Sequence, residues 1–120
     1  MLITISGLPG SGKTTVARLL SRQLGLPHIY AGDIYRKEAE ARGLSLEAFN
    51  RLSERDHSID RDLDAKMAAY ARKGNVVLEG RLAGFIVLQE QVDAFKVWLT
   101  ASVTELVTVS DPSLIVARNV

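Results

Sequence analysis

Eight residues near the start of the chain have the types and the spacing needed to hold a polyphosphate: Gly7-Leu8-Pro9-Gly10-Ser11-Gly12-Lys13-Thr14. They form a complete G-x-x-x-x-G-K-[ST] pattern. Gly7 and Gly12 permit backbone angles and a close approach that a Cβ would block, so successive N–H groups can surround an anion. Lys13 can contact the β- and γ-phosphates, and the Thr14 hydroxyl can ligate Mg²⁺. A nucleoside triphosphate is therefore expected at Gly7, Gly10, Ser11, Gly12, Lys13 and Thr14.

The residues on either side of this loop predict the elements that would position it. Residues 2–6 are a short apolar run with β-branched side chains, which is typical of a strand. After the loop, apolar residues recur at helical spacing and predict a helix over residues 12–24, whose positive end would face the phosphates. Thr15 could support Thr14 at the nucleotide or simply belong to the helix. With both flanks correct, a glycine-rich turn with a chance lysine is a poor alternative.

The rest of the chain alternates between predicted strands and helices. Three segments have the apolar composition of short strands: residues 27–30, 75–79 and 95–100. Three helices are predicted: residues 34–42, a short helix capped by Ser45, and a longer one capped by Ser58 and ended by Gly74. This alternation predicts an α/β fold with a parallel sheet flanked by helices. Ligands of such sheets bind beyond the carboxyl ends of the strands.

A first polar cluster follows the predicted strand 27–30, in Ala31-Gly32-Asp33-Ile34-Tyr35-Arg36. Gly32 would let the chain turn there. Asp33 could bind Mg²⁺ through water, and Arg36 could offer its planar guanidinium to a second phosphate. Asp33 could equally be an N-cap of the next helix beside a solvated Arg36, and these six residues alone leave both interpretations open.

A second polar cluster, Glu79-Gly80-Arg81, ends the predicted strand 75–79. Glu79 could orient the water shell of a metal ion, and Arg81 could bind the phosphate of an acceptor. The alternative is a structural ion pair at the end of the strand, formed by Glu79 with Arg81 or Lys13. A phosphate site needs such charges, so the phosphate loop favours the functional interpretation.

These motifs together resemble a nucleoside monophosphate kinase, most closely the archaeal-type cytidylate kinases. The likeness runs from Met1 to about Ala101, in five segments: residues 3–15, 30–36, 43–50, 59–61 and 74–84. We therefore expect a kinase core over residues 1–101, in which residues 33–73 approximately form a monophosphate-binding lobe. Residues 102–120 would be a divergent or truncated tail.

The resemblance implies transfer of the γ-phosphoryl group of ATP to CMP or dCMP with Mg²⁺. Carried over by position, Arg36 and Arg81 would bind the acceptor phosphate and act with Lys13 in transfer, and Asp33 would assist the metal together with Thr14 and Glu79. An adenylate kinase is an alternative, because its Gly-Asp-hydrophobic-hydrophobic-Arg pattern is similar. Asp60, Asp62 and Asp64 resemble a carboxylate cluster, but a solvated helix face explains them better, and the two histidines have no metal-spaced partners.

Composition limits the other functions. A chain of 120 residues with a formal charge of +1 predicts one domain and gives no electrostatic case for a nucleic-acid or membrane partner. Cysteine is absent, and no apolar stretch approaches the ~20 residues of a membrane span. We expect small nucleotides as partners, a monomer as in the family, and the cytoplasm as location.

The chain departs from the family after residue 100, where an arginine-bearing LID and a final helix are expected. Ser102-Val103-Thr104-Glu105 has the form of a capping box, but Leu106-Val107-Thr108-Val109-Ser110 is typical of a strand. Either the LID is deleted and residues 106–110 form a fifth strand, or an unrelated tail begins after about Thr104. Both interpretations predict a missing LID and last helix, an apolar sheet edge open to self-association, and a chain that could be a weakly active or inactive nucleotide-binding remnant.

Overall fold

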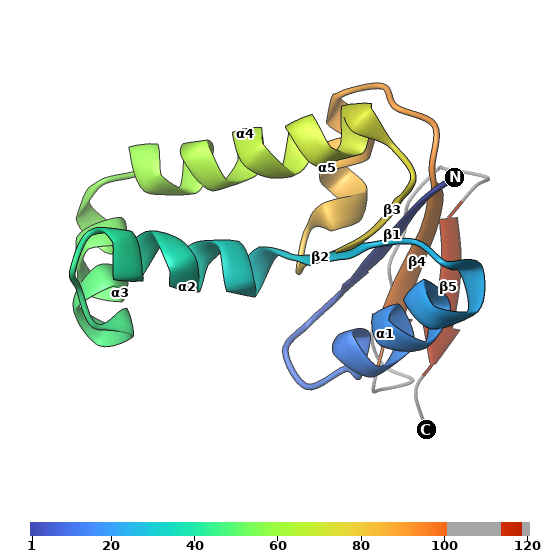
Figure 1. Ribbon diagram of the computed structural model, residues 1–120, viewed down its shortest axis with the longest axis horizontal. Coiled ribbons are helices and arrows are strands. Elements are labelled where there is room, and N and C mark those ends of the chain that lie inside the picture. Colours follow the sequence, from blue (N-terminus) through green and yellow to red (C-terminus); the bar gives the residue numbers. More distant parts are fainter. Residues whose placement is uncertain (101–113, 119–120) are drawn as a thin grey trace.

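A five-stranded parallel sheet forms the centre of the computed structural model, which describes residues 1–100 and 114–118 (Figure 1). The strands are β1 (Leu2–Gly7), β2 (His28–Tyr30), β3 (Val76–Glu79), β4 (Phe95–Thr100) and β5 (Leu114–Arg118). Their order in the sheet is β2-β3-β1-β4-β5, and each neighbouring pair is parallel. The first strand is therefore central, and its carboxyl end opens into the glycine-rich loop.

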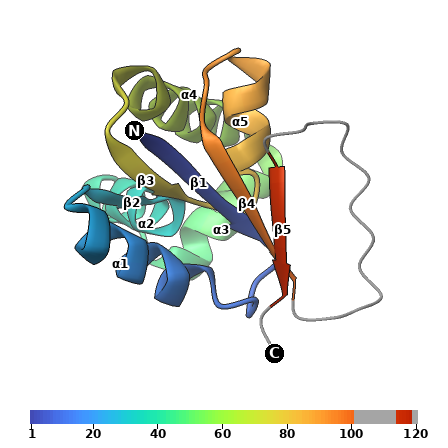
Figure 2. The same cartoon turned by 90° about the vertical axis from the view of Figure 1, so that its right-hand side faces the viewer.

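Helices cover both faces of this sheet, which confirms the three-layer α/β fold (Figure 2). They are α1 (Lys13–Leu24), α2 (Ala31–Ala41), α3 (Leu46–Arg55), α4 (Ser58–Lys73) and α5 (Ala83–Gln89). Helix α1 lies on one face, and α4 and α5 lie on the other. Helices α2 and α3 extend away from the sheet together with the start of α4 (Figure 1).

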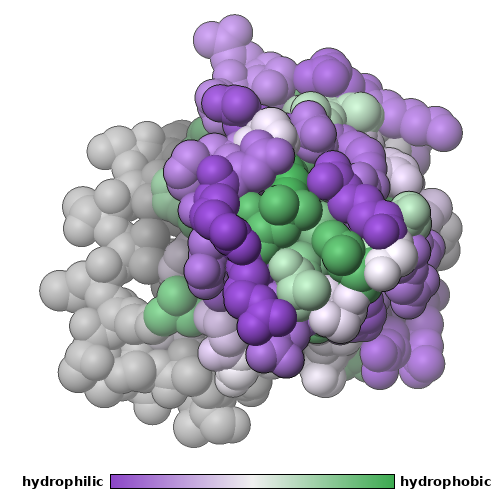
Figure 3. Space-filling view, turned by 90° about the vertical axis from the view of Figure 1, so that its left-hand side faces the viewer, coloured by the Kyte–Doolittle hydropathy of each residue, from purple (hydrophilic) through white to green (hydrophobic). Residues whose placement is uncertain are grey.

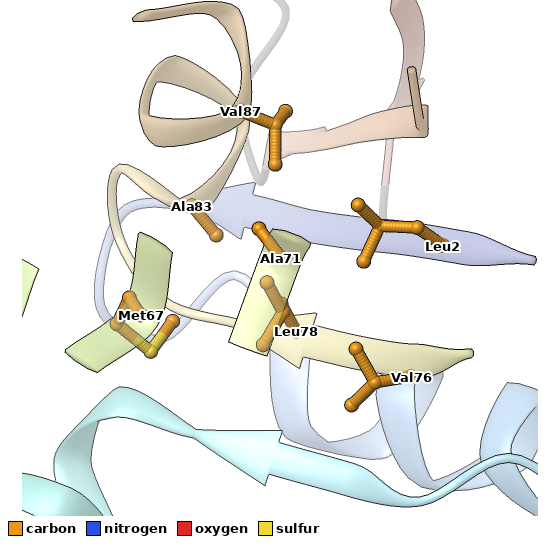
Figure 4. Packing of buried hydrophobic residues seen from close by; sticks show 7 residues of the cluster. All are labelled: Leu2, Met67, Ala71, Val76, Leu78, Ala83 and Val87. Carbon is orange, nitrogen blue, oxygen red and sulfur yellow. The ribbon is translucent and has the colours of Figure 1, made fainter. Parts of the chain in front are cut away.

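Alternation along the strands explains why both faces are covered. Residues of β1 and β3 that are two positions apart share a face, because successive side chains of a strand point to opposite sides. One set packs with α4 and α5 around Leu2, Met67, Ala71, Val76, Leu78, Ala83 and Val87 (Figure 4). The intervening residues pack with α1 around Ile3, Ile5, Ala17, Val77 and Leu99. Both strands are buried throughout, which confirms the prediction made for β3 from the apolar run 75–79.

The helices that extend from the sheet have a small core of their own. Its buried members are Ala39, Phe49 and Ile59, one from each of α2, α3 and α4. The Tyr35 ring packs on Phe49 with the centroids 4.6 Å apart. The Ser45 side chain accepts a hydrogen bond from Ala48 N at 3.1 Å, so the predicted N-cap of α3 is confirmed. Seen from the end that carries α3, apolar side chains gather in the centre of the face and polar ones surround them (Figure 3).

Helix α2 begins three residues earlier than the sequence indicates, directly after β2. The expectation that Gly32 turns the chain is therefore wrong, since Gly32 lies inside the first turn of α2. A Cβ on Gly32 would lie 2.5 Å from the Tyr30 ring, so the glycine makes room for that ring.

Two further helix starts differ from expectation. Ser58 does not cap α4, because the N-cap position is His57 and Ser58 N instead donates to the Asp56 carboxylate at 3.0 Å. Helix α5 was not predicted. It has seven residues, too few for a helical period to stand out, and Gly84 lies inside it. Gly84 N donates to Ser6 Oγ at 2.8 Å, and a Cβ on Gly84 would lie only 3.1 Å from that oxygen, so the close approach favours glycine.

The described part of the chain beyond β4 is the strand β5, which pairs with β4 along its length. The expected capping box at 102–105 and the expected strand at 106–110 lie outside the described residues. None of the described helices is both long and apolar enough to cross a membrane.

Candidate active site

The glycine-rich loop connects the central strand β1 to α1, as the motif predicts. Gly7 has a φ of +150°, and a Cβ there would lie 2.6 Å from the Leu99 carbonyl oxygen and 2.8 Å from Ser11 Oγ. Gly12 is the N-cap of α1 with a φ of +90°, in the left-handed region. These positions need glycine, because a side chain would fill the cradle or strain the backbone.

Lys13 lies at the first turn of α1 and reaches back over the loop. Its Nζ donates to the Leu8 carbonyl oxygen at 3.0 Å. Burial lowers the pKa of Lys13, the charge of Glu79 opposes this effect, and the nearby Arg81 lowers the pKa further. The ammonium of Lys13 is partly desolvated, and its hydrogen-bond partner is a neutral carbonyl. A phosphate oxygen carries a negative charge and would therefore bind this ammonium more strongly.

Glu79 is the buried acidic group of the site, with 1% of its surface exposed. Thr14 Oγ1 donates to Glu79 Oε2 at 2.6 Å, and His28 Nε2 lies 2.7 Å from Oε1. The alternative of a simple ion pair with Arg81 or Lys13 is therefore not what the structure shows, since neither cation is paired with Glu79 there. His28 had no signal in the sequence, because its partner is 51 residues away.

A cavity of about 500 Å³ opens above the loop. Its lining combines the loop, the carboxyl ends of β2 and β3, and the start of α2: Pro9, Gly10, Gly12, Lys13, Thr14, Thr15, Tyr30, Ala31, Gly32, Tyr35, Leu63, Glu79, Gly80 and Arg81. Thr15 therefore faces the cavity although most of α1 does not. The phosphate loop and the second polar cluster, Glu79-Gly80-Arg81, therefore converge at one edge of the sheet.

A second cavity of about 610 Å³ adjoins the first. It lies between α2, α4 and the start of α5, and both cavities are lined by Ala31, Tyr35, Leu63, Gly80 and Arg81. Arg81 thus contributes to both, at the junction. Two ligands bound side by side in these cavities would both lie close to its guanidinium.

The cluster after β2 is placed differently from the other two. Arg36 Nη1 donates to Asp33 Oδ1 at 3.2 Å, and both side chains are more than half exposed. Neither residue lines either cavity. The structure therefore brings Arg81, Glu79 and the loop together and leaves Asp33 and Arg36 paired with each other on the first turns of α2.

Helix α4 adds carboxylates to the second cavity, through Asp60 and Asp64. These residues are four positions apart and so lie on the same face of the helix. Desolvation raises the pKa of Asp64, and the neighbouring charge of Asp60 raises it further. Both side chains are exposed, as the expected solvated helix face predicts, and they line the same cavity as Arg81.

The described residues suit a magnesium ion that is shared with a bound ligand. In residues 1–100 and 114–118, no group of three or more His, Asp or Glu side chains is arranged to hold a metal by itself. The Thr14 hydroxyl and the Glu79 carboxylate nevertheless lie side by side at the phosphate cradle. Magnesium typically takes one or two protein oxygens and completes its shell with water and phosphate, so this donor set fits it.

The fold and this loop define the class of P-loop nucleotide-binding proteins. Similarity to known proteins agrees. A family model described as an AAA domain matches residues 6–119, and the chain belongs to that family.

The most informative relatives are described as cytidylate kinases. The chain is 44% identical over 108 residues to that of Methanopyrus kandleri, a match covering 84% of this chain and 56% of the relative. It is 47% identical over 103 residues to that of Thermococcus sibiricus, covering 86% and 52%. The resemblance inferred from the motifs is thereby confirmed. The chain spans about half the length of these curated relatives.

Solved structures of kinases share the fold. Shikimate kinase from Aquifex aeolicus superposes with a TM-score of 0.59 at 21% identity, covering 86% of this chain and 61% of that one. A sugar kinase from Janibacter sp. superposes with a TM-score of 0.63 at 19% identity, covering 98% and 84%. At such identities the likeness shows the fold alone.

Proposed function

We propose that the chain transfers the γ-phosphoryl group of ATP to a nucleoside monophosphate, with CMP or dCMP as the acceptor. The observation that carries the proposal is the pair of adjoining cavities that share Arg81, one of them built on the phosphate loop. Phosphoryl transfer requires two substrates in line and neutralised charge rather than covalent chemistry by the protein. Two cavities joined at an arginine have the layout that this reaction needs.

The donor phosphates would occupy the cradle between Gly7 and Thr14. Backbone N–H groups and the start of α1 would bind them, as at other helix N-termini. Lys13 Nζ would leave the Leu8 carbonyl oxygen, to which it now donates, and bind phosphate oxygens. Its present bond keeps the ammonium close to where those oxygens would lie, so little reorganisation would be needed on binding.

Thr14 and Glu79 would hold the magnesium ion, directly or through water. The ion, when bound, would neutralise charge on the phosphates. Because Glu79 is buried, its carboxylate stays at the edge of the sheet beside Thr14 and does not extend into solvent.

The acceptor would occupy the second cavity, with its phosphate on Arg81 and its base between α2 and α4. Asp33 and Arg36 would join the site only if α2 moved toward the loop and their mutual ion pair opened. We propose such a closure of the lobe, residues 33–73 approximately, because it would also exclude water from the phosphates. Support for CMP as the base comes from the relatives, which are described as cytidylate kinases. Such a reaction would take place in the cytoplasm, where both nucleotides occur.

An acceptor screen tests this proposal. Purified chain is given ATP and Mg²⁺ with CMP, dCMP, UMP or AMP, and ADP formation is followed. We expect acceptor-dependent ADP that is fastest with CMP or dCMP and is lost in the Lys13→Ala variant. Preference for AMP would point to an adenylate kinase. No acceptor-dependent ADP above the Lys13→Ala level would overturn the proposed activity for this chain.

A second candidate function is nucleotide binding without transfer. It is favoured by one observation, that Arg36 is paired with Asp33 and lines neither cavity. This candidate predicts ATP binding in a calorimeter together with no ADP in the acceptor screen. Absence of ATP binding would exclude both functions.

A further inference from the structure

We infer that His28 is a positioning residue, which holds the Glu79 carboxylate in the orientation that serves a magnesium ion at Thr14. The inference rests on the proposed nucleotide site and extends it to a residue outside the phosphate loop and the predicted clusters. Two hydrogen bonds carry it. Glu79 Oε2 accepts from Thr14 Oγ1 at 2.6 Å, and Oε1 accepts from His28 Nε2 at 2.7 Å.

The two oxygens of one carboxylate thus have partners on two different elements. Thr14 belongs to α1, and His28 belongs to β2. A glutamate side chain has three rotatable bonds, so a single partner would leave the carboxylate free to turn about its own axis. Partners on both oxygens fix the plane of the carboxylate, in the way that outer residues orient the ligands of a metal site.

The sheet explains why His28 reaches Glu79. Strand β2 pairs with β3 so that His28 lies beside Val77 and Tyr30 lies beside Glu79. Alternate residues of paired strands share a face, so His28 and Glu79 both point to the face covered by α1. Val77 N donates to the Pro27 carbonyl oxygen at 2.8 Å, which fixes the backbone next to His28. The imidazole therefore approaches Glu79 from a rigid element.

Burial makes this partner important. Glu79 is 1% exposed and the His28 side chain is 20% exposed, so water cannot readily replace the imidazole. Lys13 does not serve as the fixed partner of Glu79, because its Nζ donates to Leu8 O. Without His28, Glu79 Oε1 would be a buried acceptor without its hydrogen bond, and the carboxylate would rotate toward the neighbouring cations.

The test compares the affinity for a non-hydrolysable ATP analogue with Mg²⁺ and with EDTA, by calorimetry. The variants are His28→Leu, which removes the donor, His28→Gln, which can place an amide N–H near the position of Nε2, and His28→Asn, whose amide is too short. His57→Leu is the matched control, because His57 is exposed at the start of α4. The readout is the ratio of the two affinities within each variant, which cancels a general loss of binding.

We expect His28→Leu and His28→Asn to weaken binding with Mg²⁺ by about tenfold or more, as for other residues that orient metal ligands. Binding in EDTA should change less than about twofold by the same reasoning, because the loop and Lys13 are intact. His28→Gln should keep most of the magnesium effect, and His57→Leu should keep all of it. If His28→Leu does not fold, the comparison of His28→Gln with His28→Asn still decides.

An equal loss with Mg²⁺ and with EDTA would overturn the inference, because it would mean that His28 acts on the fold alone. An unchanged ratio in His28→Asn, or a wild-type chain in which Mg²⁺ does not strengthen binding, would overturn it as well. The proposed function fails separately. A wild-type chain that binds the analogue with Mg²⁺ but forms no acceptor-dependent ADP would refute the transferase activity and leave the role of His28 standing.

Discussion

Two glycines that both have positive φ provide a sharp test of how tightly the phosphate loop is packed. Gly7 ends β1 with a φ of +150°, and its position faces the Leu99 carbonyl oxygen and Ser11 Oγ. Gly25 ends α1 with a φ of +66°, and a Cβ there would meet nothing within 4 Å. Gly25→Ala therefore reports backbone strain alone, whereas Gly7→Ala reports strain together with a collision.

The magnitudes follow from these geometries. An alanine in the left-handed region costs about 1–2 kcal/mol, which is the expectation for Gly25→Ala. At Gly7 the backbone strain of an alanine is comparable, about 1–3 kcal/mol. Overpacking adds about 1–3 kcal/mol, because the Cβ would lie 2.6 Å from the Leu99 carbonyl oxygen, which can move only with β4. The total for Gly7→Ala is roughly 2–6 kcal/mol, a large part of the stability of a domain of this size.

Thermal unfolding of the two variants beside the wild type measures this difference. A loss of 1 kcal/mol lowers Tm by about 3–5 °C at this chain length. From the middle of the two ranges, we expect Gly7→Ala to lower Tm about two to three times as far as Gly25→Ala. ATP affinity should fall only in Gly7→Ala, because Ser11 must move. Equal changes in Tm would refute the packing of Gly7 against Leu99, and an unaltered ATP affinity in Gly7→Ala would refute the displacement of Ser11.

Two further predictions concern the lobe. Asp64→Asn should stabilise the chain at neutral pH, since the pKa of Asp64 is raised and its charged form therefore costs stability in the folded state. This cost disappears as the pH falls through the raised pKa toward the ordinary value, because Asp64 becomes protonated. Denaturant titrations should therefore show that the stability gained by Asp64→Asn grows from about pH 3 to 7. A gain in stability that does not depend on pH would contradict the raised pKa of Asp64. Phe49→Ala removes a fully buried ring and should cost about 3–5 kcal/mol, whereas Leu46→Ala on the same helix, where Leu46 is exposed, should cost less than ~1 kcal/mol. Hydrogen exchange should then show α2 and α3 losing protection in Phe49→Ala before β1 does, and uniform loss would contradict a separate core in the lobe.

Much of the fold follows from local patterns in the sequence. The loop motif and the apolar runs are continuous in the chain, so the strand, loop and helix at residues 2–24 and the strands at 76–79 and 95–100 were predicted within a residue or two. Ser45 was recognised as a cap because a cap bonds to a residue three positions away. Contacts of that length are visible in a sequence without knowledge of its fold.

The features that the sequence did not reveal depend on how elements are placed in three dimensions. Gly32 reads as a turn residue, but it is required by the Tyr30 ring lying over the start of α2. Helix α5 is short, and it is held by Ser6 Oγ, 78 residues away. His28 pairs with Glu79 only because β2 and β3 are neighbours in the sheet. The last two contacts need the strand order first, and the Gly32 contact needs the position at which α2 begins, so none follows from composition or periodicity.

The candidate site residues fall into two groups by location. One group belongs to the sheet and the helix packed on it, and the other belongs to the helices that extend away from the sheet. The residues that we propose act on the donor phosphates belong to the sheet or to the helix packed on it: Lys13, Thr14, Glu79 and His28. Asp33, Arg36, Asp60 and Asp64 lie on α2 and α4, which extend away from the sheet (Figure 1). Arg81 follows β3 and lines both cavities. If the proposed function holds, acceptor choice depends on how the lobe closes on Arg81. Substitutions in α2 and α4 should then change which acceptor is phosphorylated, whereas substitutions at the sheet edge should slow the reaction of ATP with every acceptor.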